Sequence, residues 1–108
     1  MAYDEVLAGR IRDHLRDVAG VTEQKMFGGL AFMTHGHLTV GVYGEGLIAR
    51  IGADGMYAAV AEPGVRPFDM SGRPMRGIIV VTGDALDDRE LERWIGQARA
   101  HVATLPPK

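Results

Sequence analysis

Apolar residues at both ends of the chain recur at helical spacing. From residue 3 to about residue 19 they return every three or four positions, and charged residues fill the opposite face. Asp4 is placed to cap this helix and Gly20 to end it in a left-handed conformation. Asp87 and Glu90 have the spacing of a capping box at the start of a second amphipathic helix. The apolar stripe of that helix consists of Leu86, Leu91, Trp94, Ile95, Ala98 and Val102.

Between these helices the period changes to short β-rich runs separated by glycine-containing turns. The runs cover residues 22–26, 30–33, 38–42, 47–51 and 78–81. Turns this short join antiparallel neighbours, because a parallel connection needs a dozen or more residues. Residues 53–61 have the spacing of a short helix. The centre of the chain therefore predicts an antiparallel meander of about four to five strands.

One segment near the middle is rich in proline and glycine. Residues 62–77 contain Pro63, Gly64, Pro67, Gly72, Pro74 and Gly77. This composition, at a length beyond that of a usual connection, predicts an irregular segment that is either functional or locally packed.

These elements together predict a single α+β domain over residues 1–108. Two amphipathic helices need an apolar partner, and a sheet supplies it, so we expect two layers with the helices mainly on one face of the sheet. If the other face is apolar as well, a second subunit or the 62–77 segment must cover it. Because the alternation along residues 38–51 is imperfect, both arrangements stay open.

The composition narrows the class of protein without naming an activity. Hydrophobic residues make up 46% of the 108 residues and charged residues 24%, which is typical of a globular domain. The absence of cysteine from the sequence excludes disulfides, thiolate zinc sites and a cysteine nucleophile. A net charge of −2 disfavours direct nucleic-acid binding. No apolar run approaches membrane-spanning length, so we expect a soluble, cytoplasmic protein that does not contact a membrane.

The histidines and the serine of the sequence do not have the spacing of a metal site or of a catalytic site. His35 and His37 flank one glycine and could share a face, but a third ligand would have to come from a distant segment, and a polar hairpin tip is the favoured interpretation. His14 and His101 are interpreted as solvated helix residues. Ser71, the one serine in the sequence, has no placed base nearby and is interpreted as a turn residue. We therefore expect no catalytic residue, no metal site and no cofactor.

The proline- and glycine-rich segment contains the one cluster of basic residues that we consider as a binding surface. Arg66, Arg73 and Arg76 stand against Glu62 and Asp69. Arginine pairs with carboxylate or phosphate, so one interpretation is a surface for an anionic ligand or a protein partner. In the other, Arg66 and Arg73 bridge to Asp69, Glu62 or exposed carbonyls and hold the segment in shape. We favour the second, because so small an excess of positive charge steers nucleic acid weakly.

Three motifs follow one another through the centre of the chain: KMFGGLAFM at 25–33, PGVRPF at 63–68 and GRPMRG at 72–77. With the closing helix around Trp94, they resemble the TfoX/Sxy N-terminal domain family over nearly the whole chain. The resemblance implies an antiparallel sheet flanked by helices. The residues that it marks as fold-defining are Phe27, Gly28, Gly29, Pro63, Gly64, Pro67, Gly72, Pro74, Gly77 and Trp94.

The founding members of that family resemble regulators of natural competence that act with the cyclic-AMP receptor protein. Those regulators carry a second, C-terminal domain, whereas this sequence ends after one domain. A task housed in the second domain is therefore not part of what the resemblance implies for this chain.

Two hypotheses of different class result. The leading one is a non-enzymatic protein-interaction or regulatory module, with a component of the transcription machinery as its partner and a homodimer as a further expectation. The alternative is a small-molecule, anion-binding or enzymatic site between the sheet and the 62–77 segment. The residues that we expect to face a ligand or partner are Lys25, Arg66, Asp69, Arg73 and Arg76.

Overall fold

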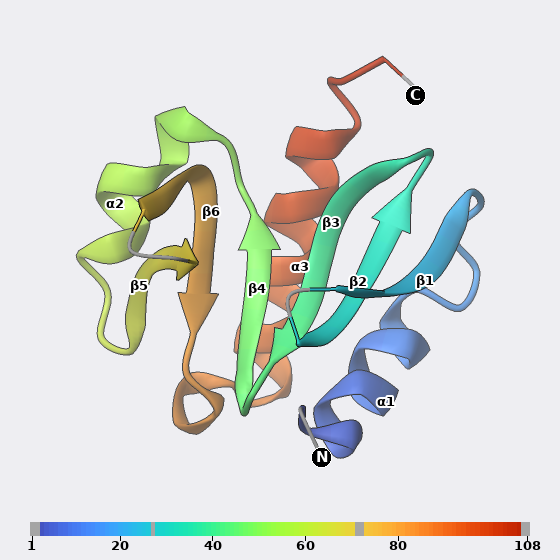
Figure 1. Ribbon diagram of the computed structural model, residues 1–108, viewed down its shortest axis with the longest axis horizontal. Coiled ribbons are helices and arrows are strands. Elements are labelled where there is room, and N and C mark those ends of the chain that lie inside the picture. Colours follow the sequence, from blue (N-terminus) through green and yellow to red (C-terminus); the bar gives the residue numbers. More distant parts are fainter. Residues whose placement is uncertain (1–2, 27, 71–72, 107–108) are drawn as a thin grey trace.

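The computed structural model describes residues 3–26, 28–70 and 73–106 of the chain. Within these residues, an antiparallel sheet of six strands runs in the order β1-β2-β3-β4-β6-β5 (Figure 1). The strands are β1 (Val21–Met26), β2 (Gly29–Thr34), β3 (His37–Tyr43), β4 (Gly46–Arg50), β5 (Val65–Met70) and β6 (Arg73–Val81). The predicted meander is confirmed, with a strand count slightly higher than expected.

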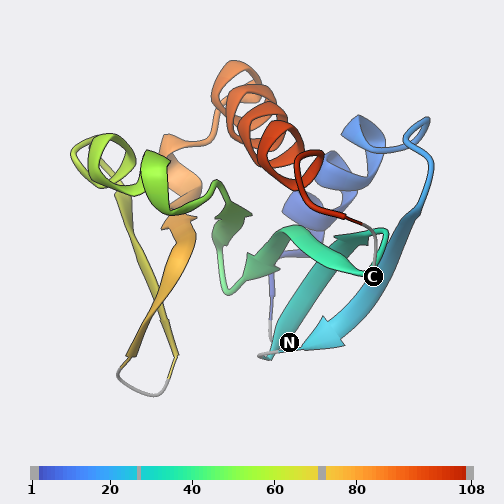
Figure 2. The same cartoon turned by 90° about the horizontal axis from the view of Figure 1, so that it is seen from above.

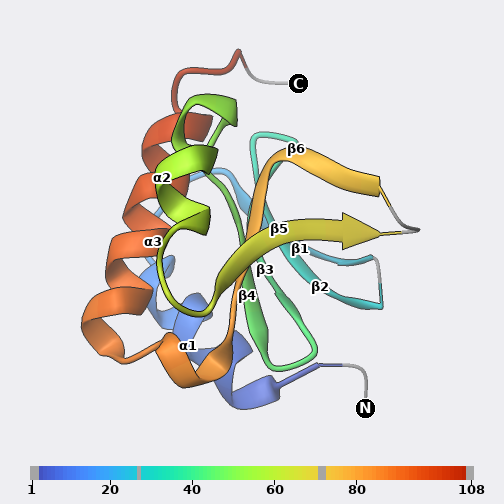
Figure 3. The ribbon, with the colours of Figure 1, turned by 90° about the vertical axis from the view of Figure 1, so that its left-hand side faces the viewer.

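The helices cover one face of this sheet. They are α1 (Glu5–His14), α2 (Met56–Val60) and α3 (Asp88–Val102), with 3-10 turns η1 (Ala53–Gly55) and η2 (Gly83–Ala85). Figures 2 and 3 show the three α-helices on the same side of the strands, which confirms the predicted two-layer arrangement. No helix in the described part of the chain is long and apolar enough to span a membrane.

The N-terminal helix is shorter than its apolar spacing predicted. Asp4 caps it as expected, because its carboxylate accepts from the backbone N–H of Val6 at 2.9 Å and of Leu7 at 3.1 Å. The helix ends at His14 rather than near residue 19, and Gly20 lies in the turn that leads to β1. Val18 extends the apolar spacing, but it reaches the core from a turn in which its N–H bonds to Leu15 O. The prediction of the helix end was therefore wrong.

The C-terminal helix begins where the sequence predicted. The Asp87 carboxylate accepts from the N–H of Glu90 at 2.8 Å. The second half of the capping box is not formed in the described contacts, since the Glu90 carboxylate accepts from Arg93 at 2.6 Å. The apolar stripe of α3, with Trp94 1% exposed, packs on the sheet.

The segment from 62 to 77 is not the irregular connection that its composition predicted. Most of it forms the hairpin of β5 and β6, with one register shift between Pro67 and Asp69. The error has a physical cause: β5 is an edge strand, where a proline can lie without breaking the sheet's ladder. Gly77 is inside β6 at φ +84°, a conformation that suits a loop as well as an irregular strand. Among the residues of this segment, Ser71 and Gly72 lie outside the described part of the chain.

Candidate functional site

The face of the sheet that no α-helix covers has an apolar cluster of its own. Ile48 of β4 pairs directly with Val80 of β6, and both side chains lie on the face opposite the helices. They cluster with Ile78 and with Phe68 of β5, which is 1% exposed. Leu38 of β3 packs against the cluster from one side. The question that the sequence left open is thus answered in part: the second face is apolar, and residues of the 62–77 segment cover some of it.

An aromatic contact closes this cluster. The ring of Tyr43 on β3 meets the ring of Phe68 on β5 edge to face, with centroids 5.3 Å apart and planes at 72°. β4 and β6 lie between these two strands in the sheet, so the contact requires the sheet to curl away from the helices. Figure 3 shows the β5–β6 hairpin projecting from the side of the sheet that faces away from the helices. We refer to this concave surface as the helix-free face.

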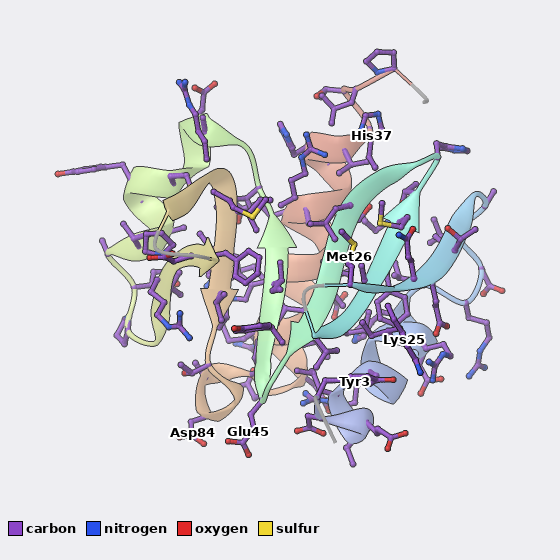
Figure 4. The ribbon with its side chains drawn as sticks, in the orientation of Figure 1. Tyr3, Lys25, Met26, His37, Glu45 and Asp84 are labelled. Atoms are coloured by element: carbon purple, nitrogen blue, oxygen red, sulfur yellow. The ribbon has the colours of Figure 1, made fainter. Side chains whose placement is uncertain are left out.

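The helix-free face also leaves apolar side chains at the protein surface. Met26 of β1 and Tyr43 are each 36% exposed. Figure 4, viewed from this side, shows Met26 lying over the front of the sheet. On the same face, Ala31 and Gly41 pair across β2 and β3, and both are buried. Met26 and Tyr43 are thus partly exposed apolar groups beside a buried part of this face.

Two arginines stand on the same face. Arg66 of β5 pairs with Val80, and Arg50 of β4 pairs with Ile78, so both share the face of the apolar cluster. Within the described residues, neither side chain forms an ion pair. Both guanidinium groups therefore keep their hydrogen-bonding capacity for another molecule.

A cleft of about 620 Å³ opens beside Arg66 at one end of the sheet. Figure 4 shows Glu45 and Asp84 next to each other at this end. The cleft combines one guanidinium with three carboxylates and is largely polar. Its lining consists of Asp4, Tyr43, Gly44, Glu45, Gly46, Arg66, Val80, Thr82, Gly83 and Asp84.

The charged residues that we expected to face a ligand do not all come together. Lys25 lies on β1, whereas Arg66 and Asp69 lie on β5 at the opposite edge of the sheet. Lys25 also belongs to the cross-sheet row of Leu30, whose side chain faces the helices. A single site that includes both Lys25 and Arg66 is therefore not formed.

The remaining charged candidates lie on the β5–β6 hairpin. Asp69 and Arg76 are exposed, and Arg73 begins β6, its side chain outside what the structure describes. The bridges from Arg66 to Asp69 or Glu62 that we expected are absent from the described contacts. Arg93 of α3 binds Glu62 instead, at 2.6 Å.

The residues marked as fold-defining occupy several kinds of position. Gly28, Gly64 and Gly77 have positive φ angles of 77°, 80° and 84°. Gly29 begins β2 and is buried, while Pro63 and Pro67 are exposed. Trp94 is buried in the helix-side core, with the Arg93 guanidinium 4.2 Å from its ring centroid. Pro74 lies in β6, and Phe27, like Gly72, is outside the described residues.

Ion pairs connect several elements on the helix side, and two of the arginines involved are Arg12 and Arg93. Arg12 of α1 binds both carboxylate oxygens of Glu23 on β1 at 2.7 Å, and this hydrogen bonding holds the pKa of Glu23 below its ordinary value. Hydrogen bonds to Glu90 and Glu62 raise the pKa of Arg93. These contacts stabilise the charged forms of Arg12, Glu23 and Arg93. They join α1 to β1 and α3 to residue 62. They are exposed and structural in character.

The histidines do not form a metal-binding group. Among the described residues, no three histidine, aspartate or glutamate side chains gather in a metal-binding arrangement. His37 Nε2 donates to the backbone carbonyl of Pro106 at 2.6 Å, which ties the C-terminal segment to β3. His35 lies in the β2–β3 turn at φ +51°. Neither residue thus belongs to a metal-binding arrangement among the described residues.

Sequence reasoning considered Phe68 as an apolar contact beside the arginines, but it missed Tyr43 and the contact between the two rings. Their contact joins residues 25 positions apart on strands that are not neighbours. A signal was present, because the runs at 30–33 and 47–51 are apolar at both odd and even positions, which is typical of strands covered on both faces.

Comparison with known proteins gives one family. The family model described as the TfoX N-terminal domain matches residues 13–102. No curated protein and no solved structure matches the chain.

Proposed function

This chain belongs to the TfoX N-terminal domain family, and from that premise we propose that it is a non-enzymatic protein-interaction module that binds through its helix-free face. The regulatory role that the family resemblance implies is part of the same proposal. A component of the transcription machinery is the class of partner that we expect.

The observation that carries the proposal is the apolar character of the helix-free face. An antiparallel sheet with one face in water normally alternates apolar and polar side chains. Here the second face buries Ile48 and Phe68 and still presents Met26 and Tyr43, each 36% exposed. Contiguous apolar side chains with aromatic and methionine groups at the surface are typical of a protein-binding patch.

The charge on this face indicates the chemistry of the partner. Arg66 is exposed, Arg50 lies on the same face, and neither has an acidic neighbour in an ion pair among the described residues. A guanidinium binds a carboxylate through two parallel hydrogen bonds. We therefore expect a partner segment that brings apolar side chains to the sheet and a carboxylate to Arg66.

The alternative, a small-molecule, anion-binding or enzymatic site between the sheet and the 62–77 segment, has less support. Phe68 fills the space between β5 and Ile48, and its ring contacts Tyr43. Packing of this kind favours a surface that another protein covers over a pocket that encloses a ligand.

Charge reversal at Arg66 tests the proposal. We expect Arg66→Glu to lower partner capture from native lysate about tenfold, because it places a like charge opposite the partner's carboxylate. The matched control is Arg89→Glu, which makes the same change of net charge at an exposed position of α3. Both variants should keep the melting temperature of the wild-type chain, since neither arginine is buried or ion-paired among the described residues. Capture is measured by chemical cross-linking and quantitative mass spectrometry.

Equal yields of the same proteins from both variants would remove the helix-free face from the proposal. The hairpin residues are tested in the same assay. We expect alanine at both Arg73 and Arg76 to weaken capture with little change in melting temperature. A large loss of thermal stability instead would assign these two arginines to holding the hairpin in shape.

A further inference from the structure

Strand β1 is an open edge of the sheet. The strand order ends at β1 on one side and at β5 on the other. β5 carries Pro67 and a register shift, and α2 packs beside it, so it is a poor template for another strand. β1 has neither a proline nor a register shift, pairs with β2 alone, and is exposed from Thr22 to Met26. An edge of this kind can accept a further strand.

One hydrogen bond identifies which residues of β1 direct their backbone groups outward. The N–H of His35 donates to the carbonyl of Gly20 at 3.0 Å, one pair before the paired residues Val21 and Thr34. In an antiparallel ladder, hydrogen-bonded and non-hydrogen-bonded pairs alternate. Even-numbered residues of β1 therefore bond to β2. The outward N–H and C=O groups belong to Val21, Glu23 and Lys25.

We propose that β1 pairs antiparallel with β1 of a second copy of this chain, about a two-fold axis at Gln24. This register places Glu23 opposite Lys25 of the second copy, and Lys25 opposite its Glu23. Each of these pairs joins outward backbone groups to outward backbone groups, as an antiparallel ladder requires. The strand sequence TEQKM thus complements itself when reversed about its centre.

The neighbouring registers lack this complementarity. Centring the pair on Glu23 places two carboxylates directly opposite each other, and centring it on Lys25 does the same with two ammonium groups. Like charges directly across a strand pair are destabilising, whereas opposite charges stabilise it. A register that pairs an odd-numbered residue with an even-numbered one would place outward backbone groups opposite backbone groups that already bond to β2. Charge and hydrogen bonding therefore select the same register.

The side chains on both faces fit this arrangement. On the helix side, Arg12 already binds Glu23 at 2.7 Å, and Lys25 of the second copy adds a second cation to that carboxylate. On the helix-free side, Met26 of the second copy lies opposite Thr22, whose neighbour on β2 is Met33. The 36% exposed Met26 thereby gains the Thr22 side chain, with its methyl group, as a neighbour across the axis. The two sheets become one continuous sheet.

A single cysteine on the axis tests the geometry. Gln24 would face its own copy in a non-hydrogen-bonded pair, with a Cα separation of about 4.5 Å, which suits a disulfide. Because the chain has no cysteine, Gln24→Cys should give a covalent dimer on a non-reducing gel after mild oxidation. The matched control is Thr22→Cys, on the same face of the same strand, whose own copy lies roughly 13 Å away. We expect this control to give no covalent dimer on the same gel.

Charge reversal tests the register independently. We expect Lys25→Glu to weaken self-association about tenfold in sedimentation equilibrium, because both cross-axis pairs become repulsive. Glu23→Lys should do the same. An equimolar mixture of the two variants should recover dimers, since each Glu of one chain then faces a Lys of the other. Arg89→Glu on α3 is the control and should dimerise as the wild type does.

Two outcomes of these experiments would contradict the proposed dimer. A wild-type chain that is monomeric at millimolar concentration overturns the proposal. So does a dimer that Lys25→Glu leaves unchanged and that Gln24→Cys cross-links no better than Thr22→Cys. Thermal melts of each variant identify any that fail to fold, and Lys25→Glu keeps the test valid if Glu23→Lys loses stability with its Arg12 contact. The partner capture assay on Arg66 is unaffected by either result.

Discussion

Gly77 joins the β5–β6 hairpin to the rest of the sheet. Its φ of +84° lies in the region that L side chains rarely adopt. Its carbonyl accepts from the N–H groups of Ile51 and Gly52 at 2.8 and 3.1 Å. A Cβ at this position would lie 3.2 Å from the backbone of Gly52 and Ala53. The residue is thus constrained by its own dihedral angle and by the chain that passes it.

Replacement of Gly77 by alanine separates these two constraints. Gly44 has φ +59° with no atom within 4 Å of a built Cβ, so Gly44→Ala reports the dihedral penalty alone. We expect Gly44→Ala to lower the free energy of unfolding by about 1–2 kcal/mol. Gly77→Ala should lower it by about 3 kcal/mol, because crowding against backbone adds to the same penalty. Urea denaturation measures both, and equal losses would show that the contact with Gly52 yields without strain.

The starts of α1 and α3 were predictable at the scale of single elements because N-terminal capping is a local interaction. Asp4 and Asp87 each bond to backbone N–H groups within three residues, so the sequence itself contains both partners. The β5–β6 hairpin was not predictable in the same way. Its prolines and glycines are typical of loops. They are tolerated because β5 lies at an edge of the sheet, and the strand order of the sheet cannot be read from residues 62–77 alone.

The cap of α3 provides the prediction at this scale. Asp87→Ala removes the acceptor for the Glu90 N–H, and we expect it to lower the free energy of unfolding by about 1 kcal/mol. Asp88→Ala is the matched control: it removes the adjacent carboxylate, whose bond to Arg10 is highly exposed, and should change stability by less than about 0.5 kcal/mol. Thermal denaturation compares the two. A loss at Asp88 as large as that at Asp87 would contradict capping as the cause.

The candidate site belongs to the whole molecule. The sequence indicated the charged residues but not their neighbours, and strand order places Lys25 and Arg66 at opposite edges of the sheet. Likewise, Tyr43 and Phe68 meet only because the sheet curls across two intervening strands. Hydrophobic periodicity reports which face a residue occupies, whereas curvature depends on register shifts and on the twist of every strand. This is why the face could be anticipated and its aromatic closure could not.

Substitution of Phe68 tests the curl of the sheet. Its side chain is 1% exposed and joins Ile48 and Val80 to Tyr43, so truncation leaves a cavity between β5 and the centre of the sheet. We expect Phe68→Ala to lower the free energy of unfolding by about 3–5 kcal/mol. Tyr57→Ala, at an 88% exposed aromatic position on α2, is the control and should have little effect.

Phe68→Leu distinguishes the contribution of buried side-chain volume from that of the aromatic contact with Tyr43. It keeps most of the buried volume but removes the edge-to-face contact with Tyr43, and we expect it to cost about 1 kcal/mol. The near-ultraviolet circular dichroism of Tyr43 should change in the same variant. If Phe68→Ala were no more destabilising than Tyr57→Ala, the hairpin would not be packed against the sheet, and the helix-free face would lose the curvature on which its proposed binding role depends.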